Sequence, residues 1–118
     1  MQPPPERTAP LVAVKLLHTA VWLFFVLCIF AIPVAGALRE FIWAAALAAL
    51  VLIECAVLVA NHGRCPSTDW AARYTGARTD NFDIYLPLWL ARYNKQIFGP
   101  VFLAGSLYAL LQWWRARP

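Results

Sequence analysis

Long apolar runs, interrupted by short polar stretches, dominate the pattern of this chain. Each run is eighteen residues or longer, and they cover residues 11–35, 41–60 and 97–114. Hydrocarbon about 30 Å thick is crossed by about 20 helical residues, and lipid offers no partners for free backbone groups. The pattern therefore predicts three transmembrane helices.

The residues around the first two runs predict how these helices begin, end and connect. Residues 1–10 hold four of the nine prolines, so we expect a flexible tail there. Pro33 and Gly36 are expected to end the first helix. Only Arg39 and Glu40 then precede the second run, and so short a connection predicts an antiparallel hairpin.

A polar connector, residues 61–95, precedes the third run. Within it, residues 65–76 are predicted to form a short helix, with Ser67 or Thr68 as its N-cap. Aromatic side chains gather on one face of this helix, so we expect it to lie on the membrane surface.

The end of the connector is apolar but short. Residues 84–91 cannot span the hydrocarbon, so we expect an interfacial, re-entrant or packed segment. Pro100 lies either in the first turn of the last helix or inside a longer helix that begins near Leu88. These two interpretations place the start of the last helix differently.

Composition supports a lipid environment. The chain has 118 residues, of which 62% are hydrophobic and 14% are charged, whereas a soluble domain has about 45–50% apolar and about 25% charged residues. This excludes a soluble monomer and a disordered chain. We expect an all-α membrane protein, in which residues 11–118 form a single domain. Its core is a small bundle of three transmembrane helices, with short interfacial helices in the second connector.

Charge distribution predicts orientation. Ten Lys and Arg residues outnumber six Asp and Glu residues, and the excess surrounds the apolar runs. The side with the N-terminus and connector carries seven basic residues: Arg7, Lys15, Arg64, Arg73, Arg78, Arg92 and Lys95. The other side carries three: Arg39, Arg115 and Arg117. The positive-inside rule then places the N-terminus and residues 61–95 in the cytoplasm and the C-terminus outside. We expect a multi-pass membrane protein that binds no nucleic acid.

Two ionisable residues inside the apolar runs are the first candidates for chemistry. His18 lies near the start of the first run and Glu54 near the end of the second, so an antiparallel hairpin places them at similar depth. Charged groups in lipid usually face the protein interior and find a partner. Three interpretations stay open: a structural clasp between helices, a ligand or proton site, and no contact at all.

A second group of polar residues follows the second run. Asn61, His62, Cys65 and Asp69 offer several metal-ligand types, but they lack a recognised zinc spacing, so we predict no metal. Cys65 is a candidate nucleophile only if a neighbour such as His62 or Arg64 lowers its pKa. Cys28 and Cys55 lie in apolar runs and are expected to act as small hydrophobic residues.

Charged residues of the connector offer one more pairing. Asp80 and Asp83 are candidates to pair across the connector with Arg73, Arg78, Arg92 or Lys95, and a pair of Asp83 with Arg92 or Arg73 gains in strength if the connector folds over the helices. Exposed pairs of this kind contribute little stability, and a covered pair contributes more.

These features together resemble a family of small, uncharacterised bacterial inner-membrane proteins with a Cys-Pro-Leu-Thr motif. The resemblance covers roughly residues 11–112. It rests on His18, Glu54, the sequence Cys65-Pro66-Ser67-Thr68, and the stretch Phe82-Asp83-Ile84-Tyr85-Leu86-Pro87. Ser67 stands where the family has Leu, and the acidic residue that usually follows the Thr is not clearly present. The resemblance implies a helical bundle with a shared pocket and no established activity.

Sequence alone favours a non-catalytic role. Nucleotide-binding and hydrolase motifs such as GxGxxG, GxSxG and HExxH are absent. We expect an accessory or structural subunit that packs, within the bilayer, against other membrane subunits or copies of itself. The alternative is a membrane-embedded ligand-binding, proton-relay or transport module that uses His18 and Glu54, with His62, Cys65 and Asp69 nearby. No cofactor is predicted.

Overall fold

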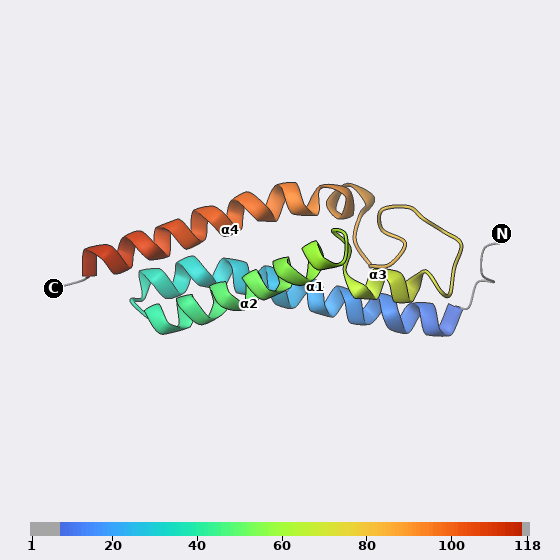
Figure 1. Cartoon of the computed structure of the whole chain (residues 1–118), viewed down its shortest axis with the longest axis horizontal. Helices are drawn as coiled ribbons and strands as arrows, with labels where there is room; N and C mark the ends of the chain where they lie inside the picture. Colours follow the sequence, from blue (N-terminus) through green and yellow to red (C-terminus); the bar gives the residue numbers. More distant parts are fainter. Residues whose placement is uncertain (1–7, 117–118) are drawn as a thin grey trace. The chain divides into compact units, whose positions relative to one another are not determined.

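The computed structural model describes residues 8–116 as an all-helical chain (Figure 1). Its helices are α1 (Thr8–Ala37), α2 (Phe41–Ala60), α3 (Pro66–Ala71) and α4 (Leu88–Ala116). No strand occurs within residues 8–116. Three of the helices, α1, α2 and α4, are long and apolar enough to cross a membrane, which agrees with the three apolar runs of the sequence.

Helix α1 is longer at both ends than its sequence pattern predicts. It begins at Thr8, so the expected tail does not include residues 8–10, and residues 1–7 lie outside the described part of the chain. Pro33 and Gly36 were expected to end the helix, but both lie inside it. The chain leaves the helix just before Arg39, whose φ of 60° is left-handed and incompatible with a continuing helix.

The later helix boundaries also differ from expectation. Helix α3 begins at Pro66 and ends at Ala71, and its N-cap is Cys65 rather than Ser67 or Thr68. Proline at the first position of a helix accounts for this early start, because its missing N–H needs no partner there. Helix α4 begins at Leu88 and contains Pro100, which is the longer of the two predicted alternatives.

The chain divides into two compact units, and the long helices contribute to both. One unit contains residues 24–55 and 95–116. Its core is apolar and consists of buried side chains from α1, α2 and α4: Cys28, Ile29, Ile32, Ala35, Ala44, Val51 and Ala109. Small residues set the contact distance between α1 and α4 there. A Cβ placed on Gly36 would lie 2.8 Å from the backbone of Ala109, so only glycine fits.

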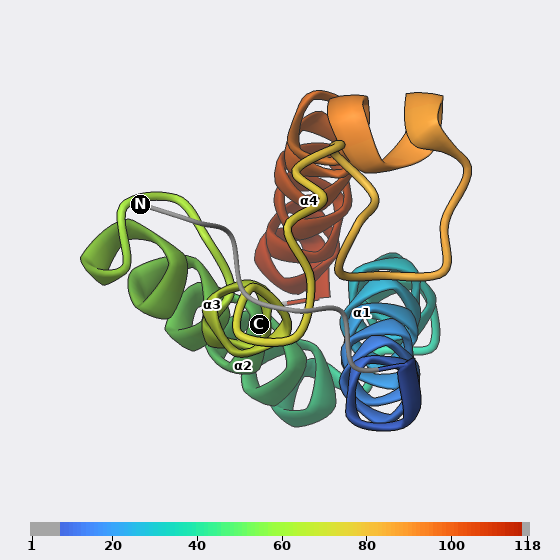
Figure 2. The same cartoon turned by 90° about the vertical axis from the view of Figure 1, so that its right-hand side faces the viewer.

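The other unit contains residues 8–23 and 56–94, and the candidate chemistry lies here. Ala71 of α3 is fully buried and packs with Leu11 and Val14 of α1. Tyr74 and Phe82 cover this small cluster. The loop after α3 lies above the N-terminal half of α1 in Figure 1, and the end-on view of Figure 2 shows part of it passing close to that helix. This packing brings the polar connector against one face of α1.

Large apolar side chains are exposed along the long helices. Ile42 is 85% exposed, Val59 is 79% exposed and Trp43 is 65% exposed. Exposure on this scale would be unfavourable in water and is what a helix surrounded by lipid requires.

Candidate functional site

One face of α1 carries polar side chains in a region that is otherwise apolar. Lys15, His18, Thr19 and Trp22 recur at intervals of three and four residues, so they share this face. Trp22 Nε1 donates a hydrogen bond to Asn94 Oδ1 at 2.8 Å. The Tyr85 N–H donates to Thr19 Oγ1 at 2.9 Å. The polar face therefore binds the connector.

His18 lies at the centre of this face and binds Asp83 of the connector. Its Nδ1 is 3.1 Å from the backbone oxygen of Asp83 and 3.4 Å from Asp83 Oδ2. Both oxygens are acceptors, so Nδ1 carries the proton and Nε2 is left for another partner. Both side chains are largely buried, with 14% of His18 and 8% of Asp83 exposed.

The thiol of Cys65 is the second partner of the imidazole. The thiol lies close enough to the His18 ring to interact with it. Burial alone would raise the pKa of Cys65. The interaction with His18, a bond from the Ser67 N–H and the charge on the His18 ring act against burial and outweigh it. The net effect holds the pKa of the thiol below its ordinary value of 9.0, which favours the thiolate.

Asp83 is held in its ionised form. Burial by itself raises the pKa of this carboxyl group. Interactions with His18 and with the Thr68 hydroxyl lower the pKa by more than burial raises it. The result is a pKa below 3.8. Thr68 Oγ1 donates directly to Asp83 Oδ2, so Asp83 is held from two sides.

His18 therefore has a different carboxylate partner from the candidate in the apolar runs. Glu54 was one candidate partner among three open interpretations, and the structure pairs His18 with Asp83. Glu54 belongs to the other unit and makes no hydrogen bond or ion pair within residues 8–116. The sequence analysis compared the depths of His18 and Glu54 in two neighbouring helices. It did not consider that the connector folds back onto α1 and brings Asp83 to His18.

The second predicted cluster does not form around Cys65. Asp69 accepts a hydrogen bond from Asn61 Nδ2 at 3.0 Å and lies 3.6 Å from the Arg64 guanidinium. His62 is exposed and has a left-handed φ of 59°. Within the described chain, no group of three His, Cys, Asp or Glu side chains is placed to hold a metal ion.

Among the candidate ion pairs of the connector, the pair of Asp80 with Arg92 forms and the pair of Asp83 with Arg92 does not. Arg92 Nε donates to Asp80 Oδ2 at 2.8 Å rather than to Asp83. Asp83 was the functional residue that sequence reasoning missed as a partner of His18. Its signal was present, because Asp83 is a lone acid between Phe82 and Ile84, and an acid in apolar surroundings needs a partner.

The three groups form a chain from carboxylate to imidazole to thiol. A nucleophilic cysteine requires a base within hydrogen-bond reach and a third group that orients the base. Cys65, His18 and Asp83 occupy these positions, and Thr68 holds the carboxylate. The Cys65 side chain is only partly buried, so the sulfur is not sealed inside the unit.

Comparison with known proteins identifies no relative: no family model, no curated protein and no solved structure matches the chain significantly.

Proposed function

We propose that this chain is a multi-pass membrane protein that carries out thiol-dependent acyl transfer, with Cys65 as the nucleophile. The observation that supports this proposal is the series of neighbouring groups Cys65, His18 and Asp83, in which His18 Nδ1 binds Asp83 and the ring interacts with the thiol. A histidine and a carboxylate also pair in proteins for structural reasons alone. Such a pair does not require a neighbouring thiol whose pKa is lowered, so the presence of Cys65 beside His18 favours a catalytic role.

Each residue has a defined role in the proposed reaction. The Cys65 thiolate attacks the carbonyl carbon of an ester or thioester, a C–S bond forms, and the bond to the leaving group breaks. The leaving group takes the proton from the His18 ring. Water then attacks the Cys65 thioester with His18 as base, which releases the acid and restores the thiol. Asp83 orients the ring and stabilises its positive charge.

The first experiment measures nucleophilicity without knowledge of the substrate. A Cys28→Ala, Cys55→Ala variant retains only Cys65, and it is purified in mild detergent. Its rate of alkylation by iodoacetamide, a small neutral reagent, is measured against pH. We expect a midpoint below 9.0, moved upward by His18→Gln. A variant that retains only the exposed Cys55 serves as the reference thiol.

The second experiment tests the covalent step. The Cys65-only variant is incubated with a short activated ester, p-nitrophenyl acetate, and its intact mass is measured. We expect a transient acetyl adduct that disappears in Cys65→Ala and accumulates more slowly in His18→Gln. Equal alkylation of Cys65 and Cys55 at all pH values, with no adduct, would contradict the proposal.

An accessory role in a membrane assembly remains the second candidate. It is favoured by the surface of α2, where Ala45, Ala49 and Ala56 are exposed on one helical face. Small residues at this spacing let helices approach closely in lipid. Ala45→Leu and Ala49→Leu are expected to weaken self-association or partner binding in size-exclusion chromatography with light scattering. Unchanged mass in both variants removes this candidate.

The cellular setting is part of the proposal. Three helices of sufficient length and the excess of basic residues before α1 and in the connector support a multi-pass topology with the connector in the cytoplasm. The proposed family resemblance is consistent with the site, because its motifs contain His18, Cys65, Thr68 and Asp83. A bacterial inner membrane follows only from that resemblance.

A further inference from the structure

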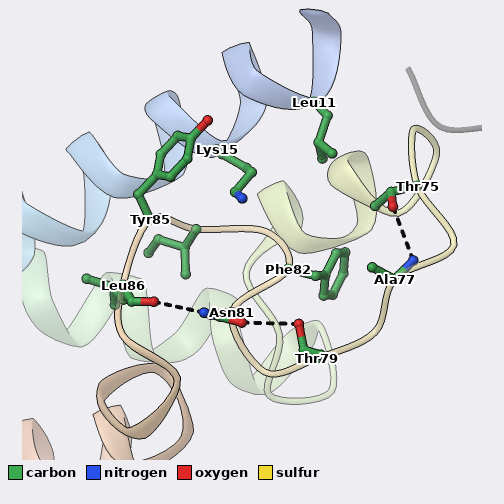
Figure 3. Close-up of a pocket in the computed structure, with 10 residues that line it drawn as sticks. Leu11, Lys15, Thr75, Ala77, Thr79, Asn81, Phe82, Tyr85 and Leu86 are labelled. Carbon is green, nitrogen blue, oxygen red and sulfur yellow. Dashed lines mark hydrogen bonds between the residues drawn. The ribbon is translucent and has the colours of Figure 1, made fainter. Parts of the chain in front are cut away.

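A cavity of about 500 Å³ lies beside the thiol site, in the same unit. Its walls come from the first two turns of α1, through Leu11 and Lys15, and from residues 75–86 of the connector (Figure 3). Lys15 precedes His18 by one helical turn on the same face of α1. The cavity is therefore a neighbour of the thiol site and not part of it.

Lys15 brings an unneutralised positive charge to this cavity. Its Nζ lies 4.4 Å from the centre of the Tyr85 ring, which also lines the cavity. In the described part of the chain, no carboxylate lies within ion-pair distance of Lys15. Figure 3 shows the side chain leaving α1 with its nitrogen turned toward the connector.

A second cation is fixed at the edge of the cavity. The Arg78 guanidinium lies 5.1 Å from the centre of the Phe82 ring, and Phe82 lines the cavity. Arg78 Nη1 donates to the backbone oxygens of Thr75 and Ala77, at 2.8 and 2.6 Å. These bonds hold the guanidinium in place without neutralising it.

The nearby acids are engaged elsewhere. Asp80 pairs with Arg92, and Asp83 binds His18 and Thr68. The remaining wall is largely apolar, with side chains such as Leu86. The Thr79 hydroxyl donates to Asn81 Oδ1 and the Asn81 amide donates to the Leu86 backbone oxygen, so these polar groups fix the shape of the wall. A cavity lined by one cation, with a second cation stacked on the lining Phe82 ring and an apolar wall beside them, is suited to the anionic group of an amphiphile.

We propose that this cavity binds a phosphate group, and that an anionic phospholipid headgroup supplies it. Lys15 lies two turns from the start of a helix long and apolar enough to cross a membrane, which is the depth at which headgroups meet a helix end. A phosphate ester from solution has the same chemistry at this cavity. The inference does not depend on the reactivity of Cys65.

The test is lipid binding by native mass spectrometry of the detergent-purified chain. Phosphatidylglycerol and phosphatidylcholine with identical acyl chains are compared, and glycerol 3-phosphate is the soluble competitor. We expect the wild-type chain to prefer phosphatidylglycerol by about fivefold or more, because each nearby cation strengthens binding of an anionic lipid to this extent. Lys15→Gln is expected to lose the preference. Lys15→Arg and the matched control Arg73→Gln, an exposed basic residue outside the cavity, are expected to keep it.

A measurement on the unaltered chain removes any dependence on the folding of variants. Acetylation of the Lys15 amine by an N-hydroxysuccinimide ester is followed by peptide mass spectrometry. Phosphatidylglycerol is expected to protect Lys15 and phosphatidylcholine is not. Displacement of the lipid by millimolar glycerol 3-phosphate would identify a soluble phosphate ester as the source of the group. Equal protection by both lipids, or an unchanged preference in Lys15→Gln, would overturn the proposal.

Discussion

Asp83 accepts hydrogen bonds from Thr68 and from His18 while it is almost fully buried. Nδ1 of His18 lies within reach of both the backbone oxygen and the carboxylate of Asp83, and Thr68 holds that carboxylate, so Asp83 fixes the orientation of the ring and favours its positive charge. The reactivity of Cys65 thus depends on a residue that it does not touch.

Asp83→Asn is predicted to reduce the reactivity of Cys65. Removal of the negative charge weakens the hold on the positively charged His18 ring, so the pKa of the thiol rises toward 9.0. Each unit of rise lowers the thiolate fraction near pH 7 about tenfold. The iodoacetamide rate of the Cys65-only variant measures this. Asp80→Asn, which removes the ion pair with exposed Arg92, is the matched control and should leave the rate unchanged.

The pKa of Asp83 also predicts how stability depends on pH. The folded carboxyl has a pKa below 3.8, so below that value the unfolded chain binds more protons than the folded chain, and stability rises with pH. The contribution of Asp83 is fully present above about pH 4–5 and is lost as pH falls through its folded pKa. Thermal unfolding in detergent between pH 3 and pH 7 should show a weaker pH dependence in Asp83→Asn. An identical dependence in both chains contradicts this.

At the scale of elements, glycine decides how closely helices pack. Gly36 of α1 faces the backbone of Ala109, and Gly105 of α4 faces the ring of Pro33 at 3.0 Å from an added Cβ. Gly99 has open space around it. The same residue type therefore has different consequences at positions that sequence alone does not distinguish.

Gly36→Ala is predicted to destabilise the unit that contains it. The new methyl group would lie 2.8 Å from Ala109, which forces α1 and α4 apart and costs about 1–3 kcal/mol. Gly99→Ala is the control, and it should be neutral or stabilising by up to about 1 kcal/mol because alanine favours helix. Denaturant unfolding in detergent compares the two variants. Equal effects would show that the contact at Gly36 is not close.

At the scale of the whole molecule, the three apolar helices are the basis of the proposed membrane topology. In the topology proposed above, three crossings place the two ends of the described chain on opposite sides of the membrane and the basic residues place the connector in the cytoplasm. Under this proposal the thiol site and the cavity face the cytoplasm, because both contain connector residues.

This topology is predicted to be visible by cysteine labelling in intact cells. Arg73→Cys and Ala116→Cys are introduced separately into a chain that lacks Cys28, Cys55 and Cys65. A membrane-impermeant maleimide should label position 116 in intact cells and position 73 only after lysis. Labelling of both positions from the same side would contradict three crossings.

The length of the apolar runs by itself determined the three helices, because the cost of free backbone groups in lipid leaves no other structure for such segments. The second helix begins and ends at its predicted residues, and His18 and Cys65 were identified from their unusual settings. Their connection to one another and to Asp83 was decided only by the tertiary structure. His18 and Asp83 are 65 positions apart, and the connector between them has no repeating pattern that sets its path. Local periodicity specifies a helix within a few turns, whereas a site made from distant residues depends on how the loop packs against α1.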